Sequence, residues 1–540
     1  MKLSASLLPF LVLLSTFCFS SSSATQTDEF LNCLALSNDS STISALLYTP
    51  NNSTFNDALL YSINNLRFAQ SSTPKPLVII TPTTESHIQN VIYCTKLTGL
   101  EMRIRSGGHS FEGFSYVSSV PFVVLDLRNI NKVTADVTTA TAWVDSGVTN
   151  GELYYYISRA TSAYGFPSGL WSNVGVGGIL SGGGYGMLRR KYGLAGDQVI
   201  DARLIDANGN ILTRETMGED LFWAIRGGGG GSFGVVVSWR VNLVPVPPVV
   251  TIFQVFRTIE QDMTNIFFKW QSVAPLFPQE LDIRCNGNVV LSENSTRSDN
   301  KTVQMSFESL YLGPASEVLA IMGEQFPELG LVEEDLIEVS YIQAMVFFSQ
   351  FPYNAPPELL LNKTILPRPA FKGRSDFFKQ PMPVEGLLGV WDYMFQLPDN
   401  QAFLQYTPFG GRMNEISETA LPFPYRAGYL YMFNFFAVTC PSLEKCEEET
   451  ARMDWVRSLD TYLTPYVSSN PRSAYVNYVN IWIGQNNPTG STSYAQASQW
   501  GKRYFGVNFD RLVAVKSVFD PTNFFRHEQS IPVFSLWSDM

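Results

Sequence analysis

Apolar runs and glycine clusters alternate along residues 74–245. A helix is predicted over 84–98, because Glu85 falls in its first turn and Gly99 directly follows its last residue. A second helix is predicted over 151–160. Four short runs, several of them rich in β-branched residues, predict strands at 76–81, 102–105, 123–127 and 141–144.

The pattern changes after about Val249. Aromatic residues and charged helical stretches dominate up to Ala474, with helices predicted over 262–273 and 315–326 and an aromatic strand over 428–436. We interpret this part as a second, α+β domain that carries an antiparallel sheet. The last patterned stretch, 504–532, is expected to fold back on the first domain.

The N-terminus has the order of a secretory signal peptide. A basic start, an apolar run over 7–18 and the small, polar stretch 20–24 predict cleavage near Ala24. The apolar run is shorter than the ~20 residues that cross a bilayer, which disfavours the alternative of a membrane anchor. We therefore expect a secreted, extracellular or cell-wall protein, with the vacuole as the other destination reached through this route.

Composition agrees with a well-buried globular protein outside the cytosol. Hydrophobic residues make up 45% and charged residues 16%, and the net charge of −11 argues against nucleic acid. Cys33–Cys94 would tie the N-terminal arm to the first domain and Cys440–Cys446 would close a short loop, which leaves Cys285 free, although sequence alone does not decide the pairing. Acceptor motifs for N-glycans lie at Asn38, Asn51, Asn52, Asn294, Asn300 and Asn362.

Two generic glycine motifs have the wrong flanks for their usual functions. Residues 229–234 fit a dinucleotide-binding pattern, and 230–234 fit the serine nucleophile pattern. Both motifs need a strand before and a helix after, whereas here a helix-like stretch precedes and a strand follows. Histidine partners for a serine are also scarce, since the chain has only His87, His109 and His527.

Glycine clusters in 165–196 and 227–234 predict a site for one extended cofactor. Glycine lets backbone N–H groups approach a ligand closely, and successive N–H groups hold pyrophosphate oxygens. The alternative interpretation is a set of flexible turns. These two ranges hold three separate glycine clusters within one domain, each beside apolar strand segments, and this arrangement favours the cofactor.

The stretch 103–113 (RIRSGGHSFEG) resembles the flavin-attachment loop of berberine bridge enzyme-like oxidases. Further matches to that family cover most of the chain and lie at 175–178, 181–186, 191–193, 197–201, 222–234, 519–526 and 528–532. The resemblance implies an α+β, two-domain flavoprotein of the vanillyl-alcohol oxidase (PCMH) type. It divides the chain into a signal peptide (1–24), an N-terminal arm (25–73), an FAD-binding domain (74–248), an antiparallel-sheet substrate domain (249–474) and a C-terminal segment that returns to the FAD domain (475–540).

By this resemblance, His109 carries FAD covalently. Other cofactor-binding residues expected from the matching motifs are Arg105, Ser106, Gly107, Gly108, Ser110, Trp171, Val174, Gly175, Gly177, Gly178, Gly182, Gly183, Tyr185, Tyr192, Asp197, Val199 and Asn523. Many relatives form a second bond through a cysteine where this chain has Trp171, so we expect a single link. Two further departures are Ile179 and Phe111, where relatives often have histidine and tyrosine.

The residues expected to act on the substrate also depart from the family's pattern. Met432 and Asn434 stand where relatives that oxidise alcohols or sugars have lysine and glutamine, and methionine neither donates a strong hydrogen bond nor lowers a tyrosine's pKa by charge. This weakens the case for a tyrosinate base. The remaining candidates for catalysis are Tyr475, Tyr478, Asn434, Tyr185 and Tyr116.

Three functions remain open. The first is a monomeric FAD oxidase that takes hydride from a small hydroxylated substrate (a carbohydrate, a phenolic alcohol or an alkaloid) and passes electrons to molecular oxygen, giving H2O2. Val174 falls at the family's oxygen-access position, where a small side chain is compatible with oxygen. The second is a redox-neutral cyclase or pericyclase, and the third a secreted binding glycoprotein with vestigial flavin. We expect no metal site and no membrane or nucleic-acid partner.

Overall fold

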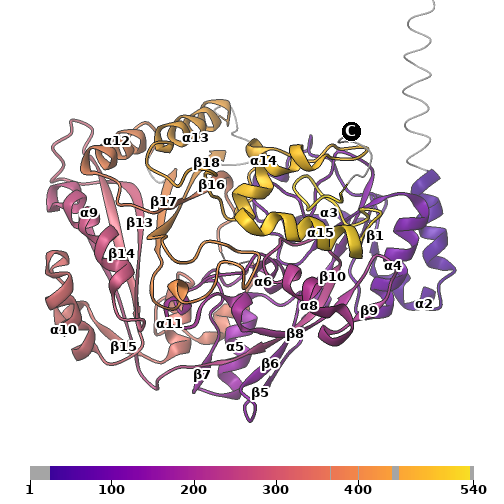
Figure 1. Cartoon of the computed structure of the whole chain (residues 1–540), viewed down its shortest axis with the longest axis horizontal. Helices are drawn as coiled ribbons and strands as arrows, with labels where there is room; N and C mark the ends of the chain where they lie inside the picture. Colours follow the sequence, from indigo (N-terminus) through magenta and orange to yellow (C-terminus); the bar gives the residue numbers. More distant parts are fainter. Residues whose placement is uncertain (1–24, 365, 399–400, 441–448, 535–540) are drawn as a thin grey trace, which may run out of the picture.

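The computed structural model describes residues 25–364, 366–398, 401–440 and 449–534. Within them, two lobes lie side by side, one built mainly from the first half of the chain and one from the second (Figure 1). The expected signal peptide and the expected Cys440–Cys446 pairing, whose second cysteine falls in 441–448, lie outside the described residues. The Cys33–Cys94 disulfide is present, and Cys285 is a buried free thiol.

The first lobe contains two main sheets. In the order β1-β2-β4-β3, the first sheet has three parallel strands and an antiparallel β1 at its edge. Its strands are β1 (Leu47–Tyr48), β2 (Val78–Ile80), β3 (Glu101–Arg105) and β4 (Phe122–Asp126). The second sheet is antiparallel, in the order β5-β6-β10-β8-β9. Its strands are β5 (Val133–Asp136), β6 (Thr141–Asp145), β8 (Val199–Ile205), β9 (Ile211–Leu212) and β10 (Val235–Asn242).

Local capping explains why the predicted helices begin and end where they do. In α4 (Glu85–Thr98), the Thr84 hydroxyl accepts a hydrogen bond from the His87 N–H at 3.2 Å, and Gly99 ends the helix with φ +67°. Further helices of this lobe are α2 (Ser40–Ile43), α3 (Phe55–Leu60), α5 (Asn150–Ala160), α6 (Val176–Ser181), α7 (Arg189–Tyr192) and α8 (Arg214–Ile225), and residues 25–35 are helical as well. The two-stranded pair β7 (Tyr164–Gly165) and β11 (Val244–Pro245) leads into the second lobe.

The C-terminal helices pack on the first lobe, above α8 and β10 in Figure 1. Helices α14 (Tyr494–Phe505) and α15 (Phe509–Phe519) bury Trp500 and Leu512 in one core with Trp239 of the five-stranded sheet. The chain thus leaves this lobe at the second domain and returns to it at its end.

The second lobe is one antiparallel sheet of seven described strands, ordered β15-β12-β14-β13-β17-β18-β16. The strands are β12 (Val250–Thr258), β13 (Leu281–Leu291), β14 (Lys301–Tyr311), β15 (Ile337–Val339), β16 (Ala370–Phe378), β17 (Ala402–Pro408) and β18 (Tyr431–Cys440). Its helices are α9 (Met263–Val273), α10 (Ala315–Gln325), α11 (Tyr341–Phe348), α12 (Val384–Met394) and α13 (Glu449–Leu463). The predicted aromatic strand begins at Tyr431 rather than 428, because Gly428 (φ +83°) lies in a turn.

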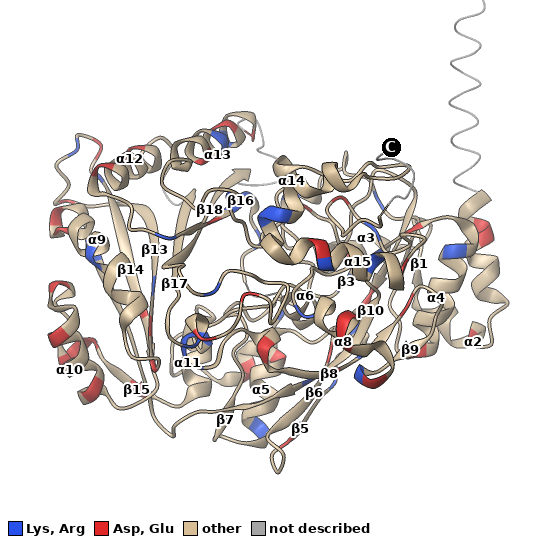
Figure 2. Cartoon of the chain, viewed as in Figure 1, with Lys and Arg blue, Asp and Glu red and all other residues tan. Residues whose placement is uncertain are grey.

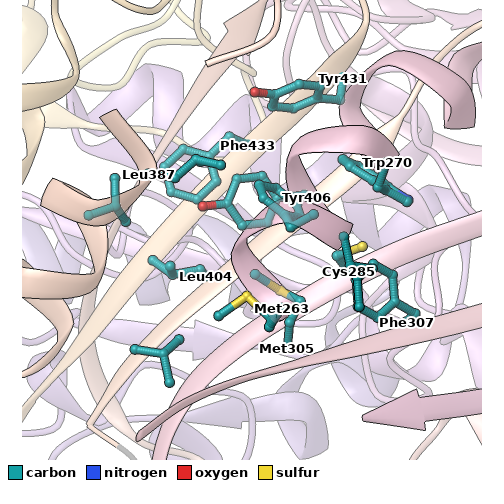
Figure 3. Packing of buried hydrophobic residues seen from close by; sticks show 14 of the residues in the cluster. Met263, Trp270, Cys285, Met305, Phe307, Leu387, Leu404, Tyr406, Tyr431 and Phe433 are labelled. Carbon is teal, nitrogen blue, oxygen red and sulfur yellow. The ribbon is translucent and has the colours of Figure 1, made fainter. Parts of the chain in front are cut away.

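One face of the seven-stranded sheet is covered and apolar. Helices α9, α10, α12 and α13 lie along it, and Trp270, Tyr406 and Phe433 pack there around the buried Cys285 (Figures 1 and 3). The opposite face turns toward the first lobe, where Met432 shares a buried cluster with Leu194 and Tyr475. The alternation of strand side chains therefore separates a structural face from a face at the seam between the lobes.

Lys and Arg lie among Asp and Glu along the ribbon of both lobes in the view of Figure 2. Among the described residues, no helix is both long and apolar enough to span a bilayer.

Candidate active site at the seam of the lobes

The loop that follows β3 is built around close backbone contacts. Arg105 ends β3 with a fully buried guanidinium that donates to Asp126 at 2.6 Å and to the carbonyls of Ala58 and Leu59. Its side chain therefore fixes the start of the loop, and a cofactor contact from Arg105 would have to come from its backbone. The Ser106 hydroxyl donates to the Ser146 carbonyl at 2.5 Å, which ties the loop to the end of β6.

Glycine is required at two positions of this loop. A Cβ on Gly107 would lie 2.2 Å from the Gly175 nitrogen, so two backbones meet there without side chains. Gly108 has φ +70°, and a Cβ on it would lie 1.6 Å from the Ser62 carbonyl oxygen. Ser110 accepts a hydrogen bond from the Phe114 N–H at 3.0 Å and so closes the turn after His109.

Two adjacent asparagines hold the loop from outside, and no sequence motif indicated them. The Asn64 amide donates to the Gly107 carbonyl at 2.7 Å. The Asn65 amide, which is buried, donates to the Phe111 carbonyl and to the Phe371 carbonyl of β16, both at 2.9 Å. The loop is thereby attached to both lobes.

His109 lies at the centre of this loop with an unused ring nitrogen. Within the described structure, its Nε2 atom is buried and has no hydrogen-bond partner. Burial lowers the pKa of the imidazole to about 4, and Asn173 opposes that shift only in part. The ring is therefore neutral at mildly acidic and neutral pH, which is the form that acts as a nucleophile.

The glycines of α6 and the turn after it fall into two kinds. A Cβ on Gly177 would lie 2.8 Å from the Ser146 carbonyl oxygen, and one on Gly182 would lie 2.1 Å from Asn477. Gly183 has φ +98°. Gly178, in contrast, is exposed, and a Cβ there would meet no atom of the described chain outside its own surroundings in α6 within 4 Å. Open space therefore adjoins α6 at Gly178, and Gly175 and Val174 lie just before it in the chain.

Several residues expected at the cofactor have side chains already engaged elsewhere. The Asp197 carboxylate accepts two hydrogen bonds from Arg426, and the Tyr192 hydroxyl donates to the Pro245 carbonyl at 2.6 Å. Val199 is buried in the core of the five-stranded sheet. These three side chains position backbone rather than reach a ligand. Two further residues expected at the cofactor have side chains free to reach a ligand. Trp171 is 43% exposed, and the Asn523 Oδ1 is buried and unpaired within the described structure.

Three of the predicted catalytic tyrosines come together at the seam. The rings of Tyr185, Tyr475 and Tyr478 lie with centroids 5.2–6.3 Å apart, and the hydroxyls of Tyr185 and Tyr478 are hydrogen-bonded to each other. The Tyr475 hydroxyl accepts from the Gly184 N–H at 3.0 Å and is buried, so it holds the glycine turn. Tyr116 lies apart from them, packed against Phe68 behind the loop.

The tyrosine pair is neutral in this setting. Burial raises the pKa of Tyr478 well above its usual value and also raises that of Tyr185, although hydrogen bonding to Tyr478 and the nearby Arg189 and Arg284 oppose the second shift. Met432 is buried beside the cluster and supplies no charge. Met432 therefore does not offset the burial that raises the pKa of both tyrosines.

Asn434 belongs to a row of polar residues across the sheet. In register on neighbouring strands stand Asn286, Gln405, Asn434 and Ser375. The Gln405 amide donates to Asn286 at 3.2 Å, and the Asn434 Oδ1 is buried with no partner in the described chain. The Ser375 hydroxyl accepts from the Tyr475 N–H at 2.9 Å, which places the row next to the tyrosines. Strand alternation alone had not indicated Asn286 or Gln405.

Comparison with known proteins gives the site its context. Residues 76–214 match the family described as FAD binding domain, and residues 474–532 match the family described as berberine and berberine like. Over 95% of this chain and 94% of the relative, the sequence is 44% identical to berberine bridge enzyme-like 24 of Arabidopsis thaliana. The chain belongs to the berberine bridge enzyme-like family. It is an FAD-linked oxidoreductase with the α+β, two-domain fold that the sequence predicted.

Other members of the berberine bridge enzyme-like family extend the comparison. Tetrahydroberberine oxidase of Argemone mexicana is 45% identical over 99% of this chain and 97% of its own. The structure of BBE-like 28 from Arabidopsis thaliana superposes with a TM-score of 0.87 at 42% identity, covering 94% of this chain and all of that one. Phl p 4, a grass pollen allergen with glucose dehydrogenase activity, has a TM-score of 0.86 at 38% identity over 94% and 99% of the two chains. Among its solved variants, one with an isoleucine-to-valine exchange is described as a glucose oxidase.

The residues at the seam fit FAD. The His109 Nε2 is buried and unpartnered within the described chain, Gly178 is exposed with open space where a Cβ would lie, and Gly230 has only Ser181 near the place of a Cβ. Backbone that lies open in this way lets a ligand such as a pyrophosphate approach closely.

Proposed function

We propose that this protein is an oxidase that carries FAD on a single covalent bond to His109. One observation carries the proposal: the neutral imidazole of His109 has a buried Nε2 without a partner in the described chain, in a loop whose backbone is packed closely against Gly175 and Ser62. Trp171 offers no thiol for a second bond. Bound FAD supplies a two-electron acceptor for the substrate's hydride.

The protein's own residues bind and orient the substrate between the cofactor side and the sheet. The amides of Gln405 and Asn434 supply neutral hydrogen-bond donors and acceptors, and the Tyr185–Tyr478 pair supplies a hydroxyl that accepts or relays a proton. A neutral tyrosine is a weak base, so substrates whose oxidation releases no strongly bound proton are favoured. Alkaloid amines and phenolic alcohols meet this condition better than sugars.

Anaerobic mixing with one sugar, one phenolic alcohol and one tertiary-amine alkaloid series tests this function. We expect an alkaloid or phenolic alcohol to bleach the flavin absorbance within one turnover. If no class bleaches the flavin, the oxidase proposal fails. If a product forms while the flavin stays oxidised and no oxygen is consumed, the redox-neutral cyclase replaces the oxidase as the proposed function. The apolar cluster around Met432 would then explain why the substrate is not oxidised.

Oxygen is the proposed final acceptor, with H2O2 as co-product. Val174 is a half-buried, small β-branched residue directly before Gly175, four residues before the exposed Gly178. The Phl p 4 variant described as an oxidase carries valine where its parent, a dehydrogenase, has isoleucine. Stoichiometric H2O2 with each substrate oxidised is the expected result, and reduction of dyes but not of oxygen would contradict it.

We also propose that the mature protein begins after Ala24 and is a secreted, monomeric glycoprotein. All six acceptor asparagines, Asn38, Asn51, Asn52, Asn294, Asn300 and Asn362, are exposed. The Cys33–Cys94 disulfide suits an oxidising compartment. N-terminal sequencing of protein exported by plant cells, with and without enzymatic removal of N-glycans, tests this. Retention of residues 1–24, or no mass loss on glycan removal, would contradict it.

A further inference from the structure

A buried ion pair joins the His109 loop to the substrate sheet. Glu112, three residues after His109, pairs with Lys372 of β16, and the two side chains are 2% and 1% exposed. The Glu112 carboxylate also accepts from Arg67 at 3.3 Å and from the Ile481 N–H at 3.2 Å. Glu112 belongs to the motif at 103–113, but Lys372 lies in no motif, and the two residues are 260 positions apart in the chain.

The His109 loop contacts both faces of β16, which is the outermost described strand of the sheet. Phe111 lies over Gly373, where a Cβ would come within 2.9 Å of the Phe111 ring. The next loop residue, Glu112, reaches Lys372, whose side chain points to the other face because neighbouring strand residues alternate. Two consecutive residues of the loop therefore fix its position along the strand and across it.

Lys372 also reaches the segment that carries Tyr478. Its ammonium donates to the Asn480 Oδ1 at 3.0 Å and lies 4.1 Å from the centre of the Trp482 ring. Phe111 meanwhile stacks on Tyr478, with ring centroids 4.8 Å apart. One cation thus touches all three parts of the site: the His109 loop, the sheet with Asn434, and the tyrosine segment.

We infer that the Lys372–Glu112 pair is a positioning device that sets the His109 loop against the substrate sheet and the Tyr478 segment. The inference rests on the proposed attachment of FAD at His109. A buried ion pair is a poor source of net stability, because desolvation offsets its attraction. Its geometric role is therefore separable from stability: neutralising both partners removes the alignment without leaving a buried charge.

The test compares Lys372→Met with the double variant Glu112→Gln/Lys372→Met, each as the full chain produced under riboflavin limitation and then given FAD. The measured quantity is the initial rate at which flavin becomes resistant to release by denaturation, per folded molecule. Misplacement of a reacting group by about 1 Å costs up to ~100-fold. We expect both variants to attach FAD about 10-fold more slowly, with the double variant close to wild-type thermal stability and Lys372→Arg restoring part of the rate.

Arg374→Met is the matched control. Arg374 is two residues along the same face of β16 and forms an ion pair with Asp460, which does not touch the His109 loop. We expect this variant to lose stability while its folded fraction attaches FAD at the wild-type rate. Wild-type attachment by the double variant, or equal slowing by Arg374→Met, would overturn the inference.

Failure of the proposed tether would give a different result. Wild-type protein would then release all its FAD on denaturation. In that case the same variants are compared by the rate at which FAD leaves the native holoprotein. If the ion pair positions the loop, the double variant should release FAD about 10-fold faster than the wild type, and Arg374→Met should not. Equal release rates would overturn the inference.

Discussion

Two adjacent glycines of α6 separate the protein's own packing from the space that FAD is proposed to fill. Gly178 is exposed, with no other part of the described chain within 4 Å of a Cβ, whereas a Cβ on Gly177 would lie 2.8 Å from the Ser146 carbonyl oxygen. We predict that Gly178→Leu leaves the folded chain as stable as the wild type or up to about 1 kcal/mol more stable, because glycine is a poor helix former.

The same Gly178→Leu change should exclude the cofactor. Forcing a side chain into a filled space costs about 1–3 kcal/mol, and each 1.4 kcal/mol is a factor of ten in affinity, so FAD binding should weaken about 5- to 150-fold. The assay is the flavin-to-protein absorbance ratio of protein produced with limiting riboflavin, measured beside thermal unfolding. The matched variant Gly177→Ala should lower stability by about 1–3 kcal/mol. Full flavin loading of Gly178→Leu would refute the placement of FAD along α6.

Three further outcomes follow from the site. Val174→Ile should slow reoxidation of the reduced flavin by oxygen at least about 10-fold, which is ~1.4 kcal/mol, with anaerobic flavin reduction unchanged in stopped-flow traces. With a phenolic alcohol as substrate, Tyr478→Phe should lower the rate of flavin reduction about 100-fold or more, the range of one lost proton-transfer group, whereas Tyr116→Phe, which lies behind the loop, should stay within about twofold. The attachment rate of FAD should be flat from about pH 5.5 to 7.5, because burial lowers the pKa of His109 to about 4 and keeps the ring neutral; a midpoint near the ordinary pKa of about 6.5 would contradict this.

The sequence predicts local structure here where capping and composition agree. The helix over 84–98 was recognisable because Glu85 and Gly99 occupy positions typical of a helix start and end, and the structure has α4 over Glu85–Thr98, with Thr84 as its cap. The FAD-linked family was recognisable because its glycine motifs need a backbone free of Cβ atoms, as the contacts of Gly107 and Gly108 demonstrate.

Contacts between distant segments were not predictable from the same patterns. Asn65 bridges the loop and β16 across 306 residues, and Lys372 meets Glu112 across 260. Asn65 and Lys372 lie in no sequence motif, and their partners are determined by how the two lobes pack together. The same reason explains why Tyr475 and Tyr116, both proposed for catalysis, hold backbone or pack behind the loop.

The row of polar residues across the seven-stranded sheet shows a second limit of prediction from sequence. Asn434 could be singled out because it stands where relatives have glutamine, but Asn286 and Gln405 became candidates only when strand register aligned them. Register depends on pairing between strands far apart in the chain. Asn286 and Gln405 therefore become candidate substrate contacts from the fold rather than from the sequence.

The most direct test of the account is mass analysis of the flavin-bearing peptide. For wild-type protein, we predict that the peptide containing His109 carries one FAD and that no other peptide carries flavin. For His109→Ala, we predict a folded protein that releases all its FAD on denaturation. Flavin covalently bound to any other residue, or retained by His109→Ala after denaturation, would contradict the single attachment through His109.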